Sequence, residues 1–325
     1  MKKISLCIPC FNEVDNVVPM ARVLTEIMEK LPQYDYEIIF TDNCSTDGTR
    51  DKLRLLAHED CHIKVLMNNR NYGCTDGRSG KNTMRYISGE VYIGLPCDFQ
   101  EPPELIPQFI SEWENGYKVV LGQKIDSEES KIKYKCRRLY YKIIDKFSDI
   151  PQYTNTSGIV LLDKYVVDEL EEVDDDIYVR NVIADMGITV KLIKYKQGKR
   201  HAGKSSYNFN RYLNFAITGM VNTSTIPLRI ATVLGFIVSF TSFVIGIVYL
   251  VLKLVFWDRF SAGMTPLLIG MFFIGAVLLL SVGIVGEYVG VVLRKVTHFP
   301  RVFTDETINF DEELAHKNNE NCHKK

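Results

Sequence analysis

Four polar segments of the chain each follow a short apolar run, and their side chains are of the kinds that bind nucleotides. These segments are residues 9–13, 41–49, 68–73 and 96–100. Carboxylates and amides can hold ribose hydroxyls and the edge of a base, and Asp98 can ligate a hard divalent cation that bridges a diphosphate. One carboxylate after a strand, such as Asp42 or Asp47, is more often only a helix cap. Several such strand ends meeting at one edge of a sheet would be a stronger indication of a ligand site.

The elements that would carry these segments alternate between strand and helix patterns through residues 1–206, which we expect to form one domain. The predicted strands are residues 4–8, 36–40, 63–66 and 91–95, and the predicted helices are 17–31, 51–57 and 77–87. This alternation predicts an α/β fold with a mostly parallel sheet covered on both faces. Ligands of such sheets bind beyond the carboxyl ends of the strands, so we expect the polar segments to meet there.

Two long apolar stretches change the class of the protein. Residues 230–252 and 262–286 each run without a charged side chain, and each exceeds the roughly 20 residues that a helix needs to cross a bilayer. We therefore expect transmembrane helices at 230–256 and 262–293, joined as a hairpin, with the second including a cytoplasmic end. The alternative is two buried helices of a soluble domain, which would need other apolar elements to cover them.

Basic residues flank this hairpin and are sparse in its loop. They lie at 199, 200, 204, 211 and 229 before it and at 294, 295 and 301 after it, whereas the loop has little more than Lys253 and Arg259. Cytoplasmic segments carry such an excess, so we expect the catalytic domain and both termini in the cytoplasm. Residues 207–229 suit an amphipathic helix in the headgroup layer, with a simple linker as the alternative. The cytoplasmic tail 294–325 is expected to be frayed from Thr304 onward.

Charge and cysteine content argue against several functional classes. Lys and Arg number 39 against 40 Asp and Glu, which leaves no overall basicity to indicate a nucleic-acid partner. Cys7 and Cys10 form a C-x-x-C pair inside an apolar run, but no second pair or nearby histidine pair completes a zinc set. We expect buried core thiols rather than metal or redox chemistry. The apolar run ends near Pro9 without a small-residue cleavage site, so we expect no signal peptide.

Several of these segments together resemble the inverting glycosyltransferases of family 2, which have the GT-A fold. The resemblance lies in residues 8–13, 42–49 and 98–104. With the late hairpin and its end at 286–290, residues 3–303 are similar to the bacterial polyprenyl-phosphate glycosyltransferases, which are related to dolichyl-phosphate mannose synthase. This resemblance implies transfer of a sugar from a nucleotide donor, usually a uridine diphosphate sugar, to undecaprenyl phosphate. It also implies a multi-pass protein of the bacterial cytoplasmic membrane that makes or modifies cell-surface glycans.

The resemblance assigns roles to individual residues. Those implied to contact the nucleotide sugar are Pro9, Asn12, Glu13, Asp42, Asp98, Gln100, Lys124 and Arg180. Those implied to act in catalysis are Asp98, Arg138, Arg200 and Lys204. Among them, Asp42 corresponds to a contact with uracil or ribose, and Arg138 to an arginine that meets the acceptor phosphate. Asp98 corresponds to the last carboxylate of the D-x-D motif, which implies a Mg²⁺ or Mn²⁺ cofactor.

The chain departs from the family pattern at two places. Pro96 stands where D-x-D has its first carboxylate, and residues 157–161 read Ser-Gly-Ile-Val-Leu where many relatives have an acidic residue and an arginine. A polyprenyl phosphate is already an oxyanion at neutral pH, so its attack on the donor needs no dedicated general base. It needs positive charge between two anions, which basic side chains and a cation would supply.

Residues 198–205 satisfy a second pattern, the G-x-x-x-x-G-K-[ST] phosphate loop of nucleotide hydrolases. Such a loop should follow a strand early in a βαβ unit, whereas here the membrane hairpin follows and no later parallel strand is expected. We favour a phosphate-handling loop at the membrane surface.

Two other functions compete with transfer to a lipid phosphate. A processive polysaccharide synthase would need more than two spans for its channel, and the chain has no Q-x-x-R-W motif. A catalytically impaired, glycosyltransferase-like membrane scaffold is suggested by Pro96, Gly158 and Val160. The partners expected of the enzyme are a nucleotide sugar, polyprenyl phosphate and the lipid bilayer. Relatives that assemble through their hairpins also lead us to expect a homo-oligomer.

Overall fold

The structure is a computed structural model of the chain. It describes residues 1–73, 77–126, 153, 155–156, 158–172, 179–198, 226–255, 264–296 and 302–310. These residues fall into two compact units. One unit contains the described residues up to 198 together with 302–310, and the other contains two long helices.

One sheet runs through the first unit, with the strand order β7-β5-β6-β4-β1-β2-β3-β8. The strands are β1 (Lys2–Cys10), β2 (Tyr34–Asp42), β3 (Ile63–Asn68), β4 (Val91–Gly94), β5 (Val119–Asp126), β6 (Val160–Asp163), β7 (Val190–Lys196) and β8 (Thr304–Ile308). The central strands β4-β1-β2-β3 are parallel, as are β5 and β7, whereas β6 and β8 run antiparallel to their neighbours. The expected α/β fold with a mostly parallel sheet is confirmed.

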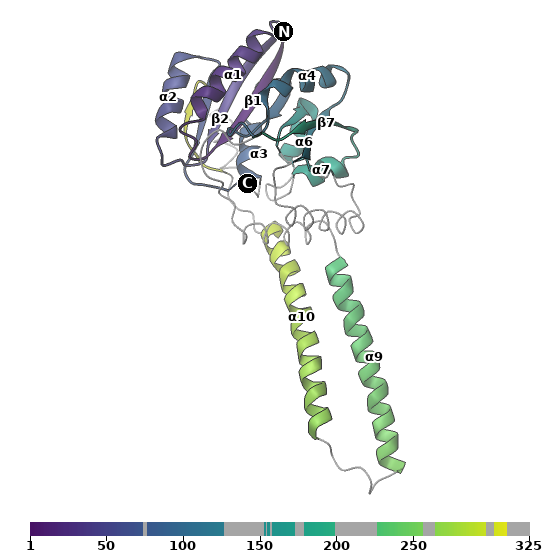
Figure 1. Ribbon diagram of the computed structural model, residues 1–325. Coiled ribbons are helices and arrows are strands. Elements are labelled where there is room, and N and C mark those ends of the chain that lie inside the picture. Colours follow the sequence, from purple (N-terminus) through teal and green to yellow (C-terminus); the bar gives the residue numbers. More distant parts are fainter. Residues whose placement is uncertain are drawn as a thin grey trace. The chain divides into compact units, whose positions relative to one another are not determined.

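Helices cover both faces of this sheet (Figure 1). They are α1 (Val17–Glu29), α2 (Thr49–Glu59), α3 (Arg78–Met84), the 3-10 helix η1 (Pro103–Leu105), α4 (Ile106–Glu114), α6 (Lys164–Glu172) and α7 (Val179–Asp185). Successive side chains of a strand point to opposite faces. In β1, Leu6 belongs to one core with Leu24 of α1 and Phe109 of α4, whereas Cys7 belongs to another with Val166 of α6. Both faces of the parallel strands are therefore buried.

The C-x-x-C pair is divided between these two cores. Cys10 lies in the core with Leu6, and Cys7 lies in the core on the opposite face. Both thiols are buried and free, and burial raises the pKa of each well above its usual value. The expected core thiols are confirmed, because side chains on opposite faces of a strand cannot share one metal ion or a disulfide.

The strands that carry the polar segments are longer than the apolar pattern indicates. β1 continues to Cys10 and β2 continues to Asp42, so Pro9 and Asp42 belong to strands rather than to the loops that follow. Pairing between the two strands extends them, with Pro9 opposite Thr41 in the register. Backbone pairing of this kind leaves no mark on the apolar pattern of a single segment.

The expectation of a frayed C-terminal tail is wrong for residues 304–308. They form β8, which pairs antiparallel with the edge strand β3. Two arginines of α2 meet its acidic side chains, since Arg54 donates to Glu306 at 2.7 Å and Arg50 lies 3.6 Å from Asp305. The acidic composition that suggested disorder is thus complementary to the basic face of a neighbouring helix.

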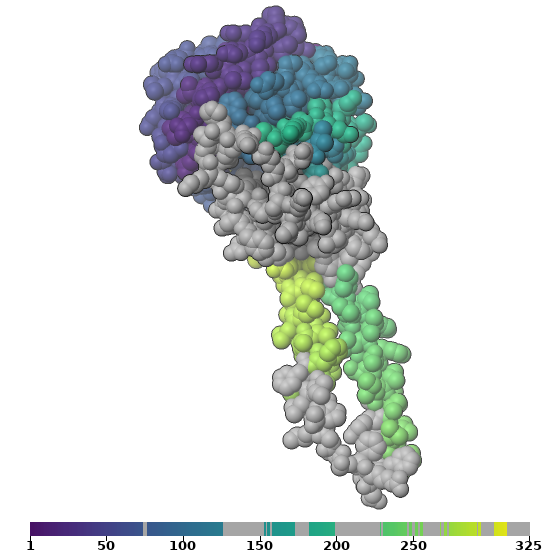
Figure 2. Space-filling view, in the orientation of Figure 1, coloured from purple at the N-terminus to yellow at the C-terminus, as the bar shows by residue number. Residues whose placement is uncertain are grey.

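The second unit contains α9 (Ile226–Val255) and α10 (Met264–Val296), which lie side by side (Figure 1). Within α10, residues 273–290 are long and apolar enough to span a membrane, whereas the apolar stretch of α9 is the shorter 230–245 among the described residues. The surface of both helices, seen in Figure 2, exposes large apolar side chains, such as Phe236 at 71% and Leu279 at 76%. The candidate span in α10 is not buried, unlike the core helix of a soluble domain, and it is the one candidate among the described residues for the two expected spans.

Candidate active site

The loops after β1 and β2 are bonded to each other at the carboxyl edge of the sheet. The Asn12 backbone donates to Ser45 Oγ at 2.8 Å, and Asn12 Oδ1 accepts from the Thr46 backbone at 2.9 Å. Asn12 has a φ of 55°, a left-handed conformation that asparagine adopts more readily than most residues. These contacts join the first two polar segments into one structure, as expected for neighbouring parallel strands.

Asp42, the last residue of β2, is completely buried at this edge. Its carboxylate accepts from Arg50 Nε at 2.7 Å and from the backbone amides of Cys44 and Ser45 at 3.1 Å each. Burial alone would lower the pKa of Arg50, but the hydrogen bond and the charge of Asp42 raise it overall. The described contacts show Asp42 shaping the loop, and its contact with a nucleotide stays a prediction.

Asp47 shapes the turn that leads into α2. Its Oδ1 accepts from the Thr49 backbone at 3.0 Å, where α2 begins, and its Oδ2 accepts from the Val14 backbone at 3.2 Å. Burial would raise the pKa of Asp47, but the hydrogen bonds from Thr49 and Val14 lower it. Asp47 therefore fixes the backbone just before α2, but the N-cap of that helix is Gly48 and no side chain caps it, so the interpretation of Asp47 as a helix cap is wrong.

The loop after β3 joins this structure through Asn43. The Asn43 side chain accepts from the Tyr72 backbone at 3.0 Å and donates to the Asn71 side chain at 3.0 Å. Asn43 also donates from its backbone to the Cys10 carbonyl at 2.9 Å. One residue after β2 thus connects the ends of all three strands.

The turn after β4 lies close to the segment after β1. β4 pairs in parallel with β1, with Gly94 opposite Cys7, and the Leu95 backbone donates to the Cys7 carbonyl at 3.2 Å. Burial raises the pKa of the Cys97 thiol, and the carboxylates of Glu13 and Asp98 raise it further. Asp98 is only 6% exposed, and its Oδ1 accepts from the Gln100 backbone at 3.1 Å. All four polar segments predicted from the sequence are therefore present at one edge of the sheet.

Glu101, a residue to which the sequence assigned no role, ties this turn to the far half of the sheet. It is buried, forms an ion pair with Lys124 Nζ of β5 at 3.0 Å, and accepts from the Tyr195 hydroxyl of β7 at 3.2 Å. The Gln100 carbonyl also accepts from the Gly198 backbone at 2.9 Å. Lys124, predicted to meet the donor, is therefore beside the site with a carboxylate as its partner.

Gly158 gives a physical reason for one departure from the family pattern. Its φ is +118°, and a Cβ there would lie 2.6 Å from Cγ and Oε1 of Glu101 and 2.7 Å from the Tyr195 hydroxyl. An acidic side chain at position 158 therefore does not fit. The carboxylate of Glu101 fills that space, so the chain keeps a negative charge there from a different element.

The remaining predicted residues are placed only in part. Pro9 is exposed at the end of β1, and Arg180 belongs to α7 with a side chain outside the described residues. Arg138, Arg200 and Lys204 lie outside the described residues. Most of the phosphate-loop pattern lies outside them as well.

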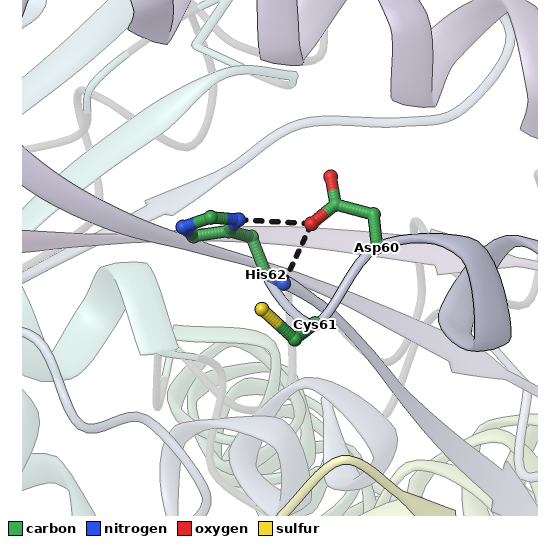
Figure 3. A group of neighbouring side chains, drawn as sticks. All are labelled: Asp60, Cys61 and His62. Atoms are coloured by element: carbon green, nitrogen blue, oxygen red, sulfur yellow. Dashed lines mark hydrogen bonds and ion pairs between the residues drawn. The ribbon is translucent and has the colours of Figure 1, made fainter.

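A second cluster with metal-ligand chemistry lies at the other end of the sheet, before β3 (Figure 3). The candidate ligand atoms of Asp60, Cys61 and His62 lie within 4.8 Å of one another. Asp60 Oδ1 accepts from the His62 backbone at 2.8 Å and lies 2.8 Å from His62 Nδ1, while the His62 ring stacks on Tyr36. These contacts form the turn that starts β3, and the cluster is not part of the carboxyl edge.

The fold defines the class of this protein, an α/β protein with polar loops beyond the carboxyl ends of parallel strands, which is where such folds bind their ligands. Residues 5–171 match the family described as Glycosyl transferase family 2. The chain therefore belongs to glycosyltransferase family 2, as the resemblance predicted, and it is a glycosyltransferase.

Similar proteins of known name cover nearly the whole chain. The bactoprenol glucosyl transferase of Shigella phage SfV is 30% identical over 301 residues, which are 92% of this chain and 97% of the relative. The prophage bactoprenol glucosyl transferase homolog of Escherichia coli strain K12 is 28% identical over 290 residues, 89% of this chain and 94% of the relative. Among solved structures, glucosyl-3-phosphoglycerate synthase from Mycobacterium tuberculosis in complex with Mn²⁺, uridine diphosphate and phosphoglyceric acid has a TM-score of 0.49, with 13% identity over 68% of this chain and 77% of that chain.

Proposed function

We propose that the chain transfers a sugar, with inversion, from a uridine diphosphate donor to undecaprenyl phosphate at the cytoplasmic face of the membrane. Relatives named bactoprenol glucosyl transferase align over almost their whole length and support this acceptor. The observation in the structure that carries the proposal is the carboxyl edge, where Asn12, Asp42 and Asp98 lie at or just after the ends of the neighbouring strands β1, β2 and β4.

The donor would bind along this edge. The ends of β1 and β2 and the loops that follow them would hold the nucleoside through Pro9, Asn12, Glu13 and Asp42, because carboxylates and amides suit base edges and ribose hydroxyls. The diphosphate would then extend toward the turn that carries Asp98. Gln100, in the same turn, would contact the donor from that side.

Asp98 fits a Mg²⁺ or Mn²⁺ ion. A carboxylate has about four lone-pair sites, so Asp98 can accept the Gln100 N–H and still ligate a cation. Magnesium keeps several waters and takes one or two carboxylates together with substrate phosphates. The single carboxylate that Pro96 leaves in the motif is therefore sufficient. When bound, the ion would neutralise charge on the departing diphosphate.

Positive charge would bring the two anionic substrates together. The acceptor phosphate is an oxyanion and needs no dedicated base, so basic side chains do the main work. Glu101 neutralises Lys124 at 3.0 Å. The net positive charge would therefore come from Arg138, Arg200 and Lys204, with Arg180 as a further contact to the donor.

The membrane is part of the proposed site. We assign α9 and α10 to a transmembrane hairpin with both termini cytoplasmic, and residues 207–229 to the headgroup layer. The acceptor phosphate is held at that depth by its lipid chain. A reporter fused at Ser261 should therefore read as periplasmic and one at the C-terminus as cytoplasmic. A homo-oligomer assembled through the hairpins is part of the same proposal.

An inactive scaffold is the alternative, and Pro96, Gly158 and Val160 motivated it. The carboxylate of Glu101 in the space at position 158 supports an active enzyme, since it provides a carboxylate there from a different element.

The test uses membranes that contain the full chain, a panel of radiolabelled nucleotide sugars, and added undecaprenyl phosphate. We expect one donor to give a label that partitions into organic solvent and depends on the added lipid. Donor hydrolysis without a labelled lipid would reject the acceptor. No reaction with any donor would favour the scaffold.

A further inference from the structure

We infer that the C-terminal strand β8 positions the loop after β2 for a nucleoside diphosphate, acting through Arg50 and Tyr72. The ligand rests on the proposed function, whereas the positioning of the loop rests on contacts within the first unit. β8 begins at Thr304, a short distance along the chain from the end of α10 at Val296. A segment that follows both long helices in the sequence is therefore part of the first unit and contacts the candidate site.

The first route from β8 to the loop is a line of charges. Asp305 lies 3.6 Å from Arg50 Nη1, and Arg50 Nε donates to Asp42 at 2.7 Å. Asp42 in turn accepts from the backbone amides of Cys44 and Ser45 at 3.1 Å each. Arg50 also donates to the carbonyl of Asn68, the last residue of β3. Arg50 therefore links β8, the end of β3 and the first residues of the loop.

The second route uses no charge. The Phe303 backbone, next to β8, donates to the Tyr72 hydroxyl at 2.9 Å, and its carbonyl accepts from the Asn69 backbone at 3.0 Å. Tyr72 is only 6% exposed, and its backbone donates to the Asn43 side chain at 3.0 Å. The second route therefore reaches Asn43, which lies between Asp42 and Cys44 of the first route.

The two routes end on residues 42–45, of which only Asp42 belongs to a helix or strand. Ser45 Oγ accepts a hydrogen bond from the Asn12 backbone N–H, so residues 42–45 also fix the loop after β1. Hydrogen bonds to charged groups are among the stronger bonds in proteins. When such bonds hold a loop in its binding shape, their loss reduces the population that can bind ligand.

The same strand provides a matched control. Glu306 is adjacent to Asp305 and forms a closer ion pair, 2.7 Å from Arg54. Arg54 otherwise pairs with Asp51 on its own helix at 2.9 Å. If β8 served only to cover the edge of the sheet, loss of the closer pair should matter at least as much as loss of the pair made by Asp305.

The first measurement is the labelling rate of Cys44 by an isotope-coded maleimide, resolved by mass spectrometry on the full chain in detergent. Cys61, which is exposed at the opposite end of β3, is the reference in the same molecule. Because bonds from a charged group fix the backbone of Cys44, we expect Arg50→Ala to speed its labelling about tenfold. Asp305→Asn and Tyr72→Phe should speed it about threefold and Glu306→Gln hardly at all.

The second measurement is the Kd of uridine diphosphate by calorimetry. It should rise in the same order, and Arg50→Lys should recover part of the loss because it restores the charge. Equal effects of Asp305→Asn and Glu306→Gln would overturn the inference, and so would unchanged Cys44 labelling in every variant. In either case, binding of uridine diphosphate by the parent would still support the proposed function. Absence of any binding by the parent would reject the nucleotide ligand and the proposed function together.

Discussion

Two buried carboxylates of β2, Glu37 and Asp42, lie toward opposite ends of the same strand. Glu37 is 1% exposed and Asp42 is 0% exposed. Glu37 accepts from Ser5 of β1 at 2.6 Å, from Ser88 at 2.7 Å, and from Lys64 of β3, whose Nζ lies 2.8 Å away. The partners of Asp42 are instead Arg50 and the backbone amides of the loop that follows. Both carboxylates are thus buried, and each forms an ion pair with a basic side chain.

What differs is the kind of neighbour. The Glu37 partners come chiefly from side chains on adjacent strands, so they close the amino end of the sheet. Of the Asp42 partners, Arg50 belongs to α2, and the two backbone amides belong to a loop. A loop backbone can rearrange around a ligand where a strand cannot. A buried charged residue therefore indicates a ligand site only when its partners lie beyond the strand ends, as they do at the carboxyl edge.

The largest effect that would separate the two ends is loss of the Asp98 carboxylate at the carboxyl edge. We expect Asp98→Asn to lower transfer at least about 100-fold, the range for removal of one positioned electrostatic group. Folding should survive, since the amide nearly matches the shape of the carboxylate. The measurement is the transfer rate against added Mg²⁺ or Mn²⁺ after chelation.

Pro96→Ala is the matched control for this variant because proline provides no ligand. It should leave much of the activity. Full activity in excess chelator, or an active Asp98→Asn protein, would show that basic side chains alone handle the diphosphate.

At the amino end the expected effect is on stability. Glu37→Gln would leave the Lys64 ammonium without its anion in a buried setting, and we expect it to lower the free energy of unfolding by about 2 kcal/mol. The Kd of uridine diphosphate should not change. Urea unfolding in detergent provides the measurement. Glu114→Gln, which breaks an exposed pair with Lys2 at 3.0 Å, should change little.

Much of the carboxyl edge could be predicted because local patterns determine it. Short, mostly apolar runs such as 4–8 and 36–40 are typical of strands buried on both faces. Once strands are located, their ends follow, and the parallel arrangement brings those ends together. Asn12, Asp42 and Asp98 were expected at one edge for this reason, and the structure places them there.

Contacts between distant segments could not be predicted in the same way. Glu101 meets Lys124 and Tyr195 because β5 and β7 pair in the far half of the sheet, and no local pattern reveals the strand order. β8 has few apolar residues, and its stability as a strand depends on the edge of β3 and on the arginines of α2. The five residues of β8 do not by themselves indicate that it pairs with β3 or that it meets the arginines of α2.

A smaller effect tests the space that Glu101 fills near the carboxyl edge. Gly158→Ala would place a Cβ 2.6 Å from Glu101 and move the partner of Lys124. We expect about tenfold slower transfer, because small displacements in a site are costly to the reaction. Gly116→Ala is the control, since Gly116 also has a positive φ, +96°, but nothing lies within 4 Å of its added Cβ. Equal activity of the two variants would show that the position of Glu101 does not affect the reaction.

The smallest expected effect is the loss of the stability contributed by Glu37 at acid pH. Burial raises the pKa of Glu37, but hydrogen bonds from Lys64, Ser5 and Ser88 lower it overall, below its ordinary value of 4.5. The unfolded chain therefore binds a proton more readily than the folded one, so this contribution to stability is complete above about pH 4.5 and is lost as the pH falls through the folded pKa. Other carboxylates with lowered pKa values, such as Asp47, add to the slope of the parent. The difference in urea midpoint between the parent and Glu37→Gln isolates Glu37, and it should shrink as the pH falls below about 4.5. A difference that stays constant with pH would mean that Glu37 stabilises the amino end by shape and hydrogen bonding and that its charge contributes nothing.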